Sequence, residues 1–187
     1  MSETPINAVE NSQKQVLASS SNNFQVELIL DIGINDYPYL IEISKYLARE
    51  FGNQALLTEK NIPKYFNKNT LPFIARYNKE IIGYIIGVPI EIFKDESWAQ
   101  YDYNMGKHNT LYTYSFVIKK QYQSRGGYAK TLKRIYLNWA KKKHYKYITG
   151  HVRQGIAKKF SKDTQIIKIF PKWYGQETPF EYYRRLL

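Results

Sequence analysis

The sequence contains no cysteine in its 187 residues. This absence excludes disulfide bridges, thiolate zinc sites and cysteine nucleophiles, so any chemistry must use His, Ser, Thr, Tyr, Lys or the carboxylates. Histidine is also scarce, at three residues. The segment 91–109 carries Asp95, Glu96, Asp102 and His108, but these residues do not follow the ligand spacing of a known metal site. No metal is therefore expected.

Long apolar runs are missing as well. No run approaches the roughly 20 residues of a membrane-spanning helix, and the N-terminal residues lack the basic and then apolar layout of a secretory signal. These features predict a cytoplasmic protein with no membrane contact.

Acidic residues are few relative to basic ones. The chain has 16 Asp and Glu against 28 Lys and Arg, which gives a net charge of +12. Such an excess favours polyanionic partners, such as nucleic acid, a membrane surface or a phosphorylated cofactor. A basic composition that only keeps the protein solvated has the same charge, so the charge alone does not choose among these interpretations.

Hydrophobic residues make up 43% of the chain and include 18 Tyr, 9 Phe and 3 Trp, which is ample for a folded core. The stretch before Phe24 is polar and ends in a run of Ser and Asn. It predicts a flexible tail over residues 1–23, because such a segment buries too little apolar area to offset its ordering entropy. One folded domain is expected over residues 24–187.

Hydrophobic periodicity predicts strands and helices in this domain. The segment 91–109 has no clean periodicity and is expected to carry function or flexibility. By period-two counting, Tyr112, Tyr114, Phe116 and Ile118 should share one face of their strand. The expected strands are 24–30, 71–77, 81–90, 111–118, 145–152, 165–170 and 179–187, and the expected helices are 35–52, 58–66, 130–143 and 153–161.

The loop from Gln123 to Lys130 leaves the strand 111–118 and opens a basic helix. A helix start presents free backbone N–H groups and partial positive charge, which favour phosphate binding. Two glycines allow a ligand to approach the backbone closely, and Arg125 adds a fixed cation. Neither GxxxxGK[ST] nor GxGxxG is present, and the glycine pair taken alone is equally typical of a tight turn.

In this context the sequence YQSRGGYAKTL, placed after YTYSFVIKK, resembles the GNAT superfamily of acetyl-CoA-dependent N-acetyltransferases. The family signature is Gln or Arg, two residues, Gly, one residue, and then Gly or Ala. Gln123, Gly126 and Tyr128 occupy these three places, so the last one departs from the pattern. The resemblance covers residues 24–187 and implies an α/β fold of the α+β kind, with a mixed, splayed central sheet flanked by helices.

The resemblance implies acetyl-CoA as co-substrate, held in a notch between the strands 111–118 and 145–152. Its pantetheine arm would pair with the first of these strands, and its pyrophosphate would lie on the loop amides. The family's usual Asn and Tyr beyond the notch are not clearly present. Gln154 and Ser161 stand near their places, and Tyr174, Tyr182 or Tyr183 could reach in instead. The expected cofactor contacts are Phe116, Val117, Ile118, Gln123, Ser124, Arg125, Gly126, Gly127, Tyr128, Ala129, Lys130, Gln154 and Ser161.

Acetyl transfer to an amine needs a base, and the strand 111–118 contains no carboxylate. Tyr112 lies on this strand, and His151 lies at the end of the strand across the notch. Their placement resembles the pair that some GNAT members acting on protein N-termini use, through water, to deprotonate the amine. Tyr112 and His151 are therefore the expected catalytic residues, the alternative being an ordinary strand tyrosine and a polar strand end.

The expected function is transfer of an acetyl group from acetyl-CoA to a primary amine of a peptide, a protein or a small molecule, by a monomer or homodimer. One alternative is a non-catalytic CoA-binding protein of the same family. Another, less favoured, is a nucleic-acid-binding module whose basic helix tracks phosphates while tyrosines stack on bases. Acetyl transfer requires the notch beside the strand, and nucleic-acid binding does not.

Overall fold

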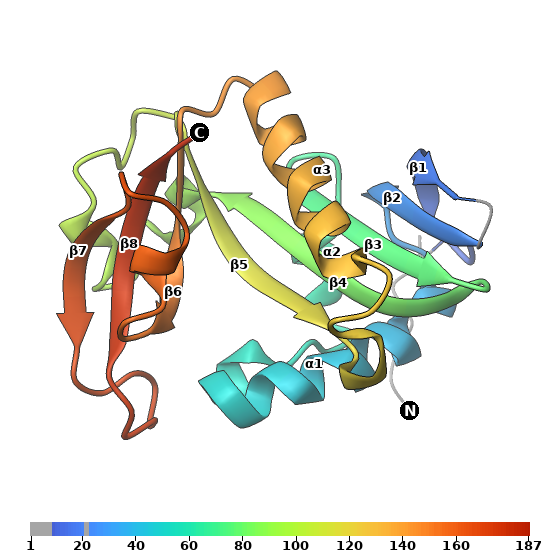
Figure 1. Ribbon diagram of the computed structural model, residues 1–187, viewed down its shortest axis with the longest axis horizontal. Coiled ribbons are helices and arrows are strands. Elements are labelled where there is room, and N and C mark those ends of the chain that lie inside the picture. Colours follow the sequence, from blue (N-terminus) through green and yellow to red (C-terminus); the bar gives the residue numbers. More distant parts are fainter. Residues whose placement is uncertain (1–8, 21–22) are drawn as a thin grey trace.

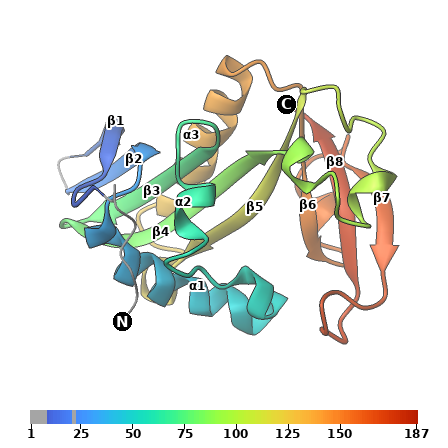
Figure 2. The same cartoon turned by 180° about the vertical axis from the view of Figure 1, so that it is seen from behind.

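A computed structural model describes residues 9–20 and 23–187, which form one sheet with helices on both faces (Figure 1, Figure 2). The strand order is β1-β2-β3-β4-β5-β6-β8-β7, and neighbours are antiparallel except β5 and β6, which are parallel. The expected mixed sheet flanked by helices is confirmed. The strands are β1 (Gln13–Ser19), β2 (Phe24–Asp31), β3 (Leu71–Tyr77), β4 (Glu80–Pro89), β5 (Thr110–Ile118), β6 (Tyr147–Arg153), β7 (Gln165–Phe170) and β8 (Phe180–Leu186), and the α-helices are α1 (Tyr37–Phe51), α2 (Ile62–Tyr65) and α3 (Tyr128–Lys142).

The helices bury their apolar stripes on opposite faces of the sheet (Figure 1, Figure 2). Leu40, Ile43 and Leu47 recur at helical spacing and place α1 in one core cluster, which α2 also joins. Leu132 and Tyr136 place α3 in a second cluster on the other face. Helices cover both faces of the sheet, so a ligand can reach its interior only between strands or around an edge.

A bulge in β5 changes which residues share a face. Ile86 of β4 pairs with Ser115, but Gly87 pairs with Thr113, so Tyr114 is an extra residue in β5. The expected face with alternating Tyr112, Tyr114, Phe116 and Ile118 is therefore wrong. The two tyrosines pack on the α1 side, whereas Phe116 and Ile118 pack on the α3 side.

Two sequence expectations need correction. Residues 13–19, expected within a flexible tail, form β1 and pair with β2, because an edge strand is held by backbone hydrogen bonds and needs little apolar side-chain burial. Residues 1–8 and 21–22 of that tail lie outside the described residues. The expected helix 153–161 is only a 3-10 turn at Ala157–Lys159, preceded by Gly155 at φ +88°. Within the described ranges, no helix is long and apolar enough to cross a membrane.

A buried ion network fixes the N-terminal edge of the sheet. The Glu27 side chain on β2 is fully buried and accepts hydrogen bonds from Lys14 of β1 at 2.6 Å and from Arg76 of β3 at 2.7 Å. Arg76 also donates to Asp36 at 2.8 Å, and Asp36 accepts a hydrogen bond from Ser12 at 2.6 Å. Asp36 precedes α1 but its carboxylate serves this network, not the helix N-terminus. The network therefore joins β1, β2, β3 and the start of α1.

Substitution Arg76→Met should lower the free energy of unfolding by about 3 kcal/mol, because it leaves buried carboxylates without their main partner. Lys14→Met is the matched control. Its ammonium is partly exposed, at 36% for the side chain, so its loss should cost less than about 1 kcal/mol. Urea unfolding measures both, and equal losses would contradict the central place given to Arg76.

Candidate active site

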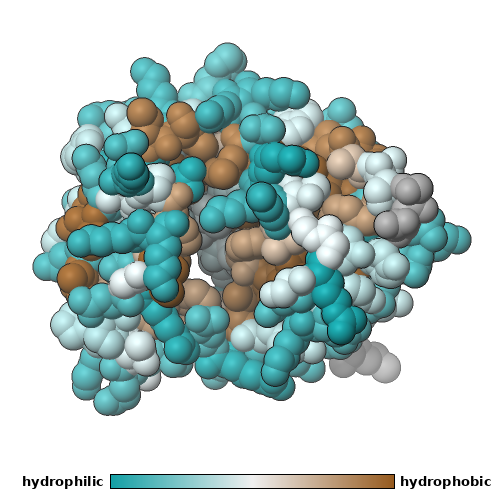
Figure 3. Space-filling view, in the orientation of Figure 1, coloured by the Kyte–Doolittle hydropathy of each residue, from teal (hydrophilic) through white to brown (hydrophobic). Residues whose placement is uncertain are grey.

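A cavity of about 410 Å³ passes through the sheet where β5 and β6 separate. These two strands pair only from Thr110–Tyr147 to Tyr112–Thr149, and they diverge beyond that point. The space-filling view shows the surface hollowed at this position, with apolar residues around the hollow (Figure 3). The lining includes residues of both core clusters, so the cavity joins the α1 face to the α3 face.

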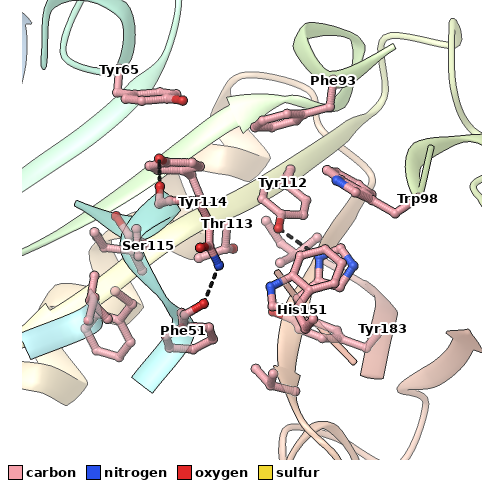
Figure 4. Close-up of a pocket in the computed structure, with 18 of the residues that line it drawn as sticks. Phe51, Tyr65, Phe93, Trp98, Tyr112, Thr113, Tyr114, Ser115, His151 and Tyr183 are labelled. Carbon is pink, nitrogen blue, oxygen red and sulfur yellow. Dashed lines mark hydrogen bonds between the residues drawn. The ribbon is translucent and has the colours of Figure 1, made fainter. Parts of the chain in front are cut away.

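Tyr112 and His151 meet in the wall of this cavity (Figure 4). The Tyr112 hydroxyl lies 2.8 Å from Nδ1 of His151, so the two side chains are joined by a direct hydrogen bond across the parting strands. Nε2 of His151 is buried and has no partner among the described residues. One imidazole nitrogen of a residue that lines the cavity is therefore buried without a hydrogen-bond partner.

Aromatic rings enclose His151. Its imidazole stacks on Trp173 with the ring centres 3.7 Å apart, and Trp98 meets it edge-on at 4.8 Å. Burial lowers the pKa of His151 well below its ordinary value of 6.5 and raises the pKa of the Tyr112 hydroxyl well above 10. Both groups are therefore uncharged at neutral pH. The cause of the neutral imidazole is desolvation.

The loop before α3 follows the end of β5 and lies outside the cavity lining. Gly126 and Gly127 have φ of +54° and +65°, and Gly127 precedes the helix with no side chain capping it. The first turn of α3 contains no acidic residue, so its free N–H groups and dipole are not neutralised there. The Gln123 side chain donates a 2.8 Å hydrogen bond to the carbonyl of Ile118, which ties the loop to the end of β5. This arrangement suits an anion.

Tyr128, at the place where the signature has Gly or Ala, turns its ring back over the loop. A Cβ on Gly126 would come within 2.5 Å of this ring, so only glycine fits beneath it. The ring also packs on Phe24, with centres 4.6 Å apart, and on Tyr77. The departure from the signature is thus accommodated by packing against the sheet.

Residues 39–159, more than half of the chain, match the acetyltransferase (GNAT) family. The chain belongs to this family. No match was found among curated protein sequences.

Solved structures of GNAT acetyltransferases share the fold. A GCN5-related N-acetyltransferase from Kribbella flavida is 15% identical with a TM-score of 0.64, and the alignment covers 90% of this chain and 100% of that one. A ribosomal-protein-alanine N-acetyltransferase from Brucella melitensis is 13% identical, with a TM-score of 0.59 and coverage of 84% and 98%. A GNAT acetyltransferase from Elizabethkingia anophelis with acetyl-CoA bound is 17% identical, with a TM-score of 0.54 and coverage of 89% and 100%.

Most of the residues expected to contact the cofactor lie outside the cavity of this GNAT protein. Phe116 lines the cavity, and the backbone of β5 from Thr113 onward pairs with β4 on one side only. The other expected contacts do not line the cavity: Val117, Ile118, Gln123, Ser124, Arg125, Gly126, Gly127, Tyr128, Ala129, Lys130, Gln154 and Ser161. Gln154 is exposed, and the Ser161 hydroxyl lies 3.0 Å from that of Thr164.

Two lining residues of this GNAT site, Trp98 and Trp173, were not predicted, because they come from irregular segments that carry no motif. Of the tyrosines expected to reach in from the C-terminal part, Tyr174 and Tyr183 line the cavity and Tyr182 does not. The density of aromatic residues in 91–109 and 170–183 was the available signal. Asp102 proves to be a structural anchor, because its buried carboxylate accepts hydrogen bonds from Tyr182 at 2.6 Å and Arg184 at 3.0 Å.

His151 should make the stability of this GNAT protein depend on pH. Its pKa in the folded state lies below the unfolded value of about 6.5, so below pH 6.5 the unfolded chain takes up a proton that the folded one does not. Below pH 6.5 the free energy of unfolding should then decrease, by up to about 1.4 kcal/mol for each unit by which the pH is lowered.

Urea unfolding at pH 7.5 and 5.5 measures this effect, and His151→Phe should reduce the difference between the two by about 1 kcal/mol. An unchanged difference in the variant would show that His151 is protonated in the folded protein as readily as in the unfolded one.

Proposed function

We propose that this chain transfers an acetyl group from acetyl-CoA to a primary amine. The observation that carries the proposal is the continuity of the cavity. It links a strand edge left unpaired by the divergence of β5 and β6 with the buried Tyr112–His151 pair, and β5 leads on to the uncapped start of α3. A long phosphorylated thioester and an amine acceptor can meet in such a passage from its two ends.

The residues present fit acetyl-CoA. Its pyrophosphate would be held by the N–H groups at the start of α3, with Arg125 and Lys130 nearby in sequence. Its pantetheine amides would pair with the free backbone edge of β5 as an added strand. The Ser115 hydroxyl, buried in the cavity wall with no partner among the described residues, offers a further hydrogen bond. When bound, the thioester supplies the activated acyl group.

Tyr112 and His151 would receive the proton that the amine loses. The Tyr112 hydroxyl can take that proton while passing its own to Nδ1 of His151 through the direct 2.8 Å hydrogen bond. The water that the family resemblance implies would stand between the amine and this pair, because Tyr112 and His151 already bond each other directly. Because the imidazole is desolvated, it is a weak base, and it most readily deprotonates an amine whose own pKa is low.

This weakness favours α-amines over lysine-type amines as acceptors. At pH 7.5 about a third of an α-amine with a pKa near 7.8 is neutral, against about 0.1% of a lysine side chain with a pKa near 10.4. A site with a weak base would lose more than a hundredfold in reactive acceptor by using the lysine-type amine.

Substitution Gly127→Asp should abolish binding of acetyl-CoA, because a carboxylate at the start of α3 would repel the pyrophosphate. Position 127 is open, with no atom within 4 Å of an added Cβ, so the change should not disturb packing. Gly106→Asp is the matched control: it adds the same charge, at a φ of +80° and in equally open space, outside the cavity lining. Calorimetry with acetyl-CoA measures both, and normal affinity in the Gly127 variant would refute the phosphate site.

Tyr112→Phe and His151→Ala should each lower kcat by about 10²-fold, with acetyl-CoA affinity nearly unchanged, because neither residue touches the phosphate loop. The double variant should lose less than the product of the two, since the residues act as one relay. Transfer of labelled acetyl groups to a panel of peptides and metabolites measures turnover. Tight acetyl-CoA binding with no acceptor acetylated would identify a binding protein and not an enzyme.

A further inference from the structure

Charge is divided between the two ends of the cavity. Its cationic lining residues, Lys133 and Arg185, lie on α3 and β8, and burial together with the charge of Arg185 lowers the pKa of Lys133. Glu96 is the one carboxylate among the lining residues that the structure describes. It comes from the segment between β4 and β5, whose rings Phe93 and Trp98 belong to the α1-side cluster. The cavity therefore has a cationic and an anionic end.

Glu96 is held in place but not neutralised. Its N–H bonds the carbonyl of Phe93 at 2.9 Å, its own carbonyl accepts from Ala99 at 3.0 Å, and its carboxylate accepts a 2.9 Å hydrogen bond from the Tyr174 hydroxyl. Burial, and then this bond, raise the pKa of Tyr174 to about 12, so Tyr174 stays a donor at neutral pH. Within the described ranges, no basic side chain lies within 4 Å of Glu96, although the chain carries an excess of 12 positive charges.

Aromatic rings lead from Glu96 to the Tyr112–His151 pair. Tyr174 meets Trp173 edge-on at 4.8 Å, and Trp173 stacks on His151. On the other side, Phe93 and Trp98 each lie 4.9 Å from the ring of Tyr112 (Figure 4). A carboxylate beside aromatic faces attracts a single organic cation through charge and cation–π contact. A second cationic group on the same molecule would lie either against apolar rings or near Lys133 and Arg185 at the other end of the cavity. Both positions disfavour a second charge.

From this arrangement we infer that Glu96 recognises the ammonium of the acceptor, and that the acceptor is a primary amine with one positive charge beside a bulky apolar group. The inference rests on the proposed function and names its acceptor class. Tyr174 acts as a positioning residue, because it orients the Glu96 carboxylate through its hydrogen bond.

Binding of three small probes in the absence of acetyl-CoA tests the inference. L-Phenylalaninamide carries both the ammonium and the apolar group, 3-phenylpropanamide lacks the amine, and glycinamide lacks the ring. At about pH 6, where α-amines are protonated, the first should bind roughly fivefold tighter than the second and at least about tenfold tighter than the third. Trp98 and Trp173 line the cavity, so quenching of tryptophan fluorescence reports occupancy.

Glu96→Gln should remove the preference for phenylalaninamide over 3-phenylpropanamide and leave the affinity for 3-phenylpropanamide unchanged. Asp95→Asn is the matched control, because Asp95 is an exposed neighbour outside the cavity lining and its removal changes the net charge equally. It should leave the preference intact. Tyr174→Phe should weaken the preference without abolishing it.

Equal affinity of the wild-type protein for phenylalaninamide and 3-phenylpropanamide would overturn the inference, as would an equal loss of preference in the Asp95 and Glu96 variants. Equal affinity for glycinamide would overturn the apolar part. Because these assays contain no acetyl-CoA, a protein that recognises the ammonium but never acetylates it would refute the proposed function and leave the recognition site standing.

Discussion

The parting of β5 and β6 beyond the pair Tyr112–Thr149 is the constraint on which the site depends. Two unpaired strand edges inside a fold are costly, since backbone N–H and C=O groups need partners. Here the parting is built into the packing. The bulge at Tyr114 turns β5, and the ring of Tyr183 lies over Gly150, where any Cβ would come within 3.3 Å of it. The opening is therefore a property of the folded chain, and a ligand that pairs with β5 would satisfy groups the protein leaves free.

In the proposed function, the opening would also let a strongly basic protein hold two substrates of opposite charge. Lys133, Arg185 and the uncapped start of α3 give the α3 side a positive field, while Glu96 gives the α1 side a negative one. Glu96 is exposed, so solvent screens its charge more than the charges of the half-buried Lys133 and Arg185. An anionic acyl carrier and a cationic amine would thus be drawn to different sides, and neither would compete for the other's place.

Sequence and structure agree where information is local. The strand, the Gly-Gly loop and the basic helix each follow from neighbouring residues. The pair Tyr112 and His151 followed only from the resemblance to the GNAT family, and the structure joins the two side chains by a hydrogen bond. The bulge at Tyr114 was not predictable, because the sequence 111–118 alternates evenly and gives no sign that one of its residues is extra. Trp98, Trp173 and Glu96 converge only through tertiary packing of irregular segments. Strand β1 was missed because its partners are a backbone edge and the buried Glu27, not apolar side chains.

The enclosure of His151 has an energetic consequence for binding. A buried polar atom without a partner costs about 1–3 kcal/mol, and Nε2 of His151 and the hydroxyl of Ser115 are two such atoms in the cavity wall. A ligand that bonds these two atoms would regain that free energy, and this gain would add to its affinity. The aromatic rings that create this cost also exclude water and fix the imidazole against Tyr112. Burial of the site therefore lowers both the stability of the protein and the basicity of His151, and it fixes the imidazole against Tyr112. In the proposed function, such a pair would suit an amine of low pKa.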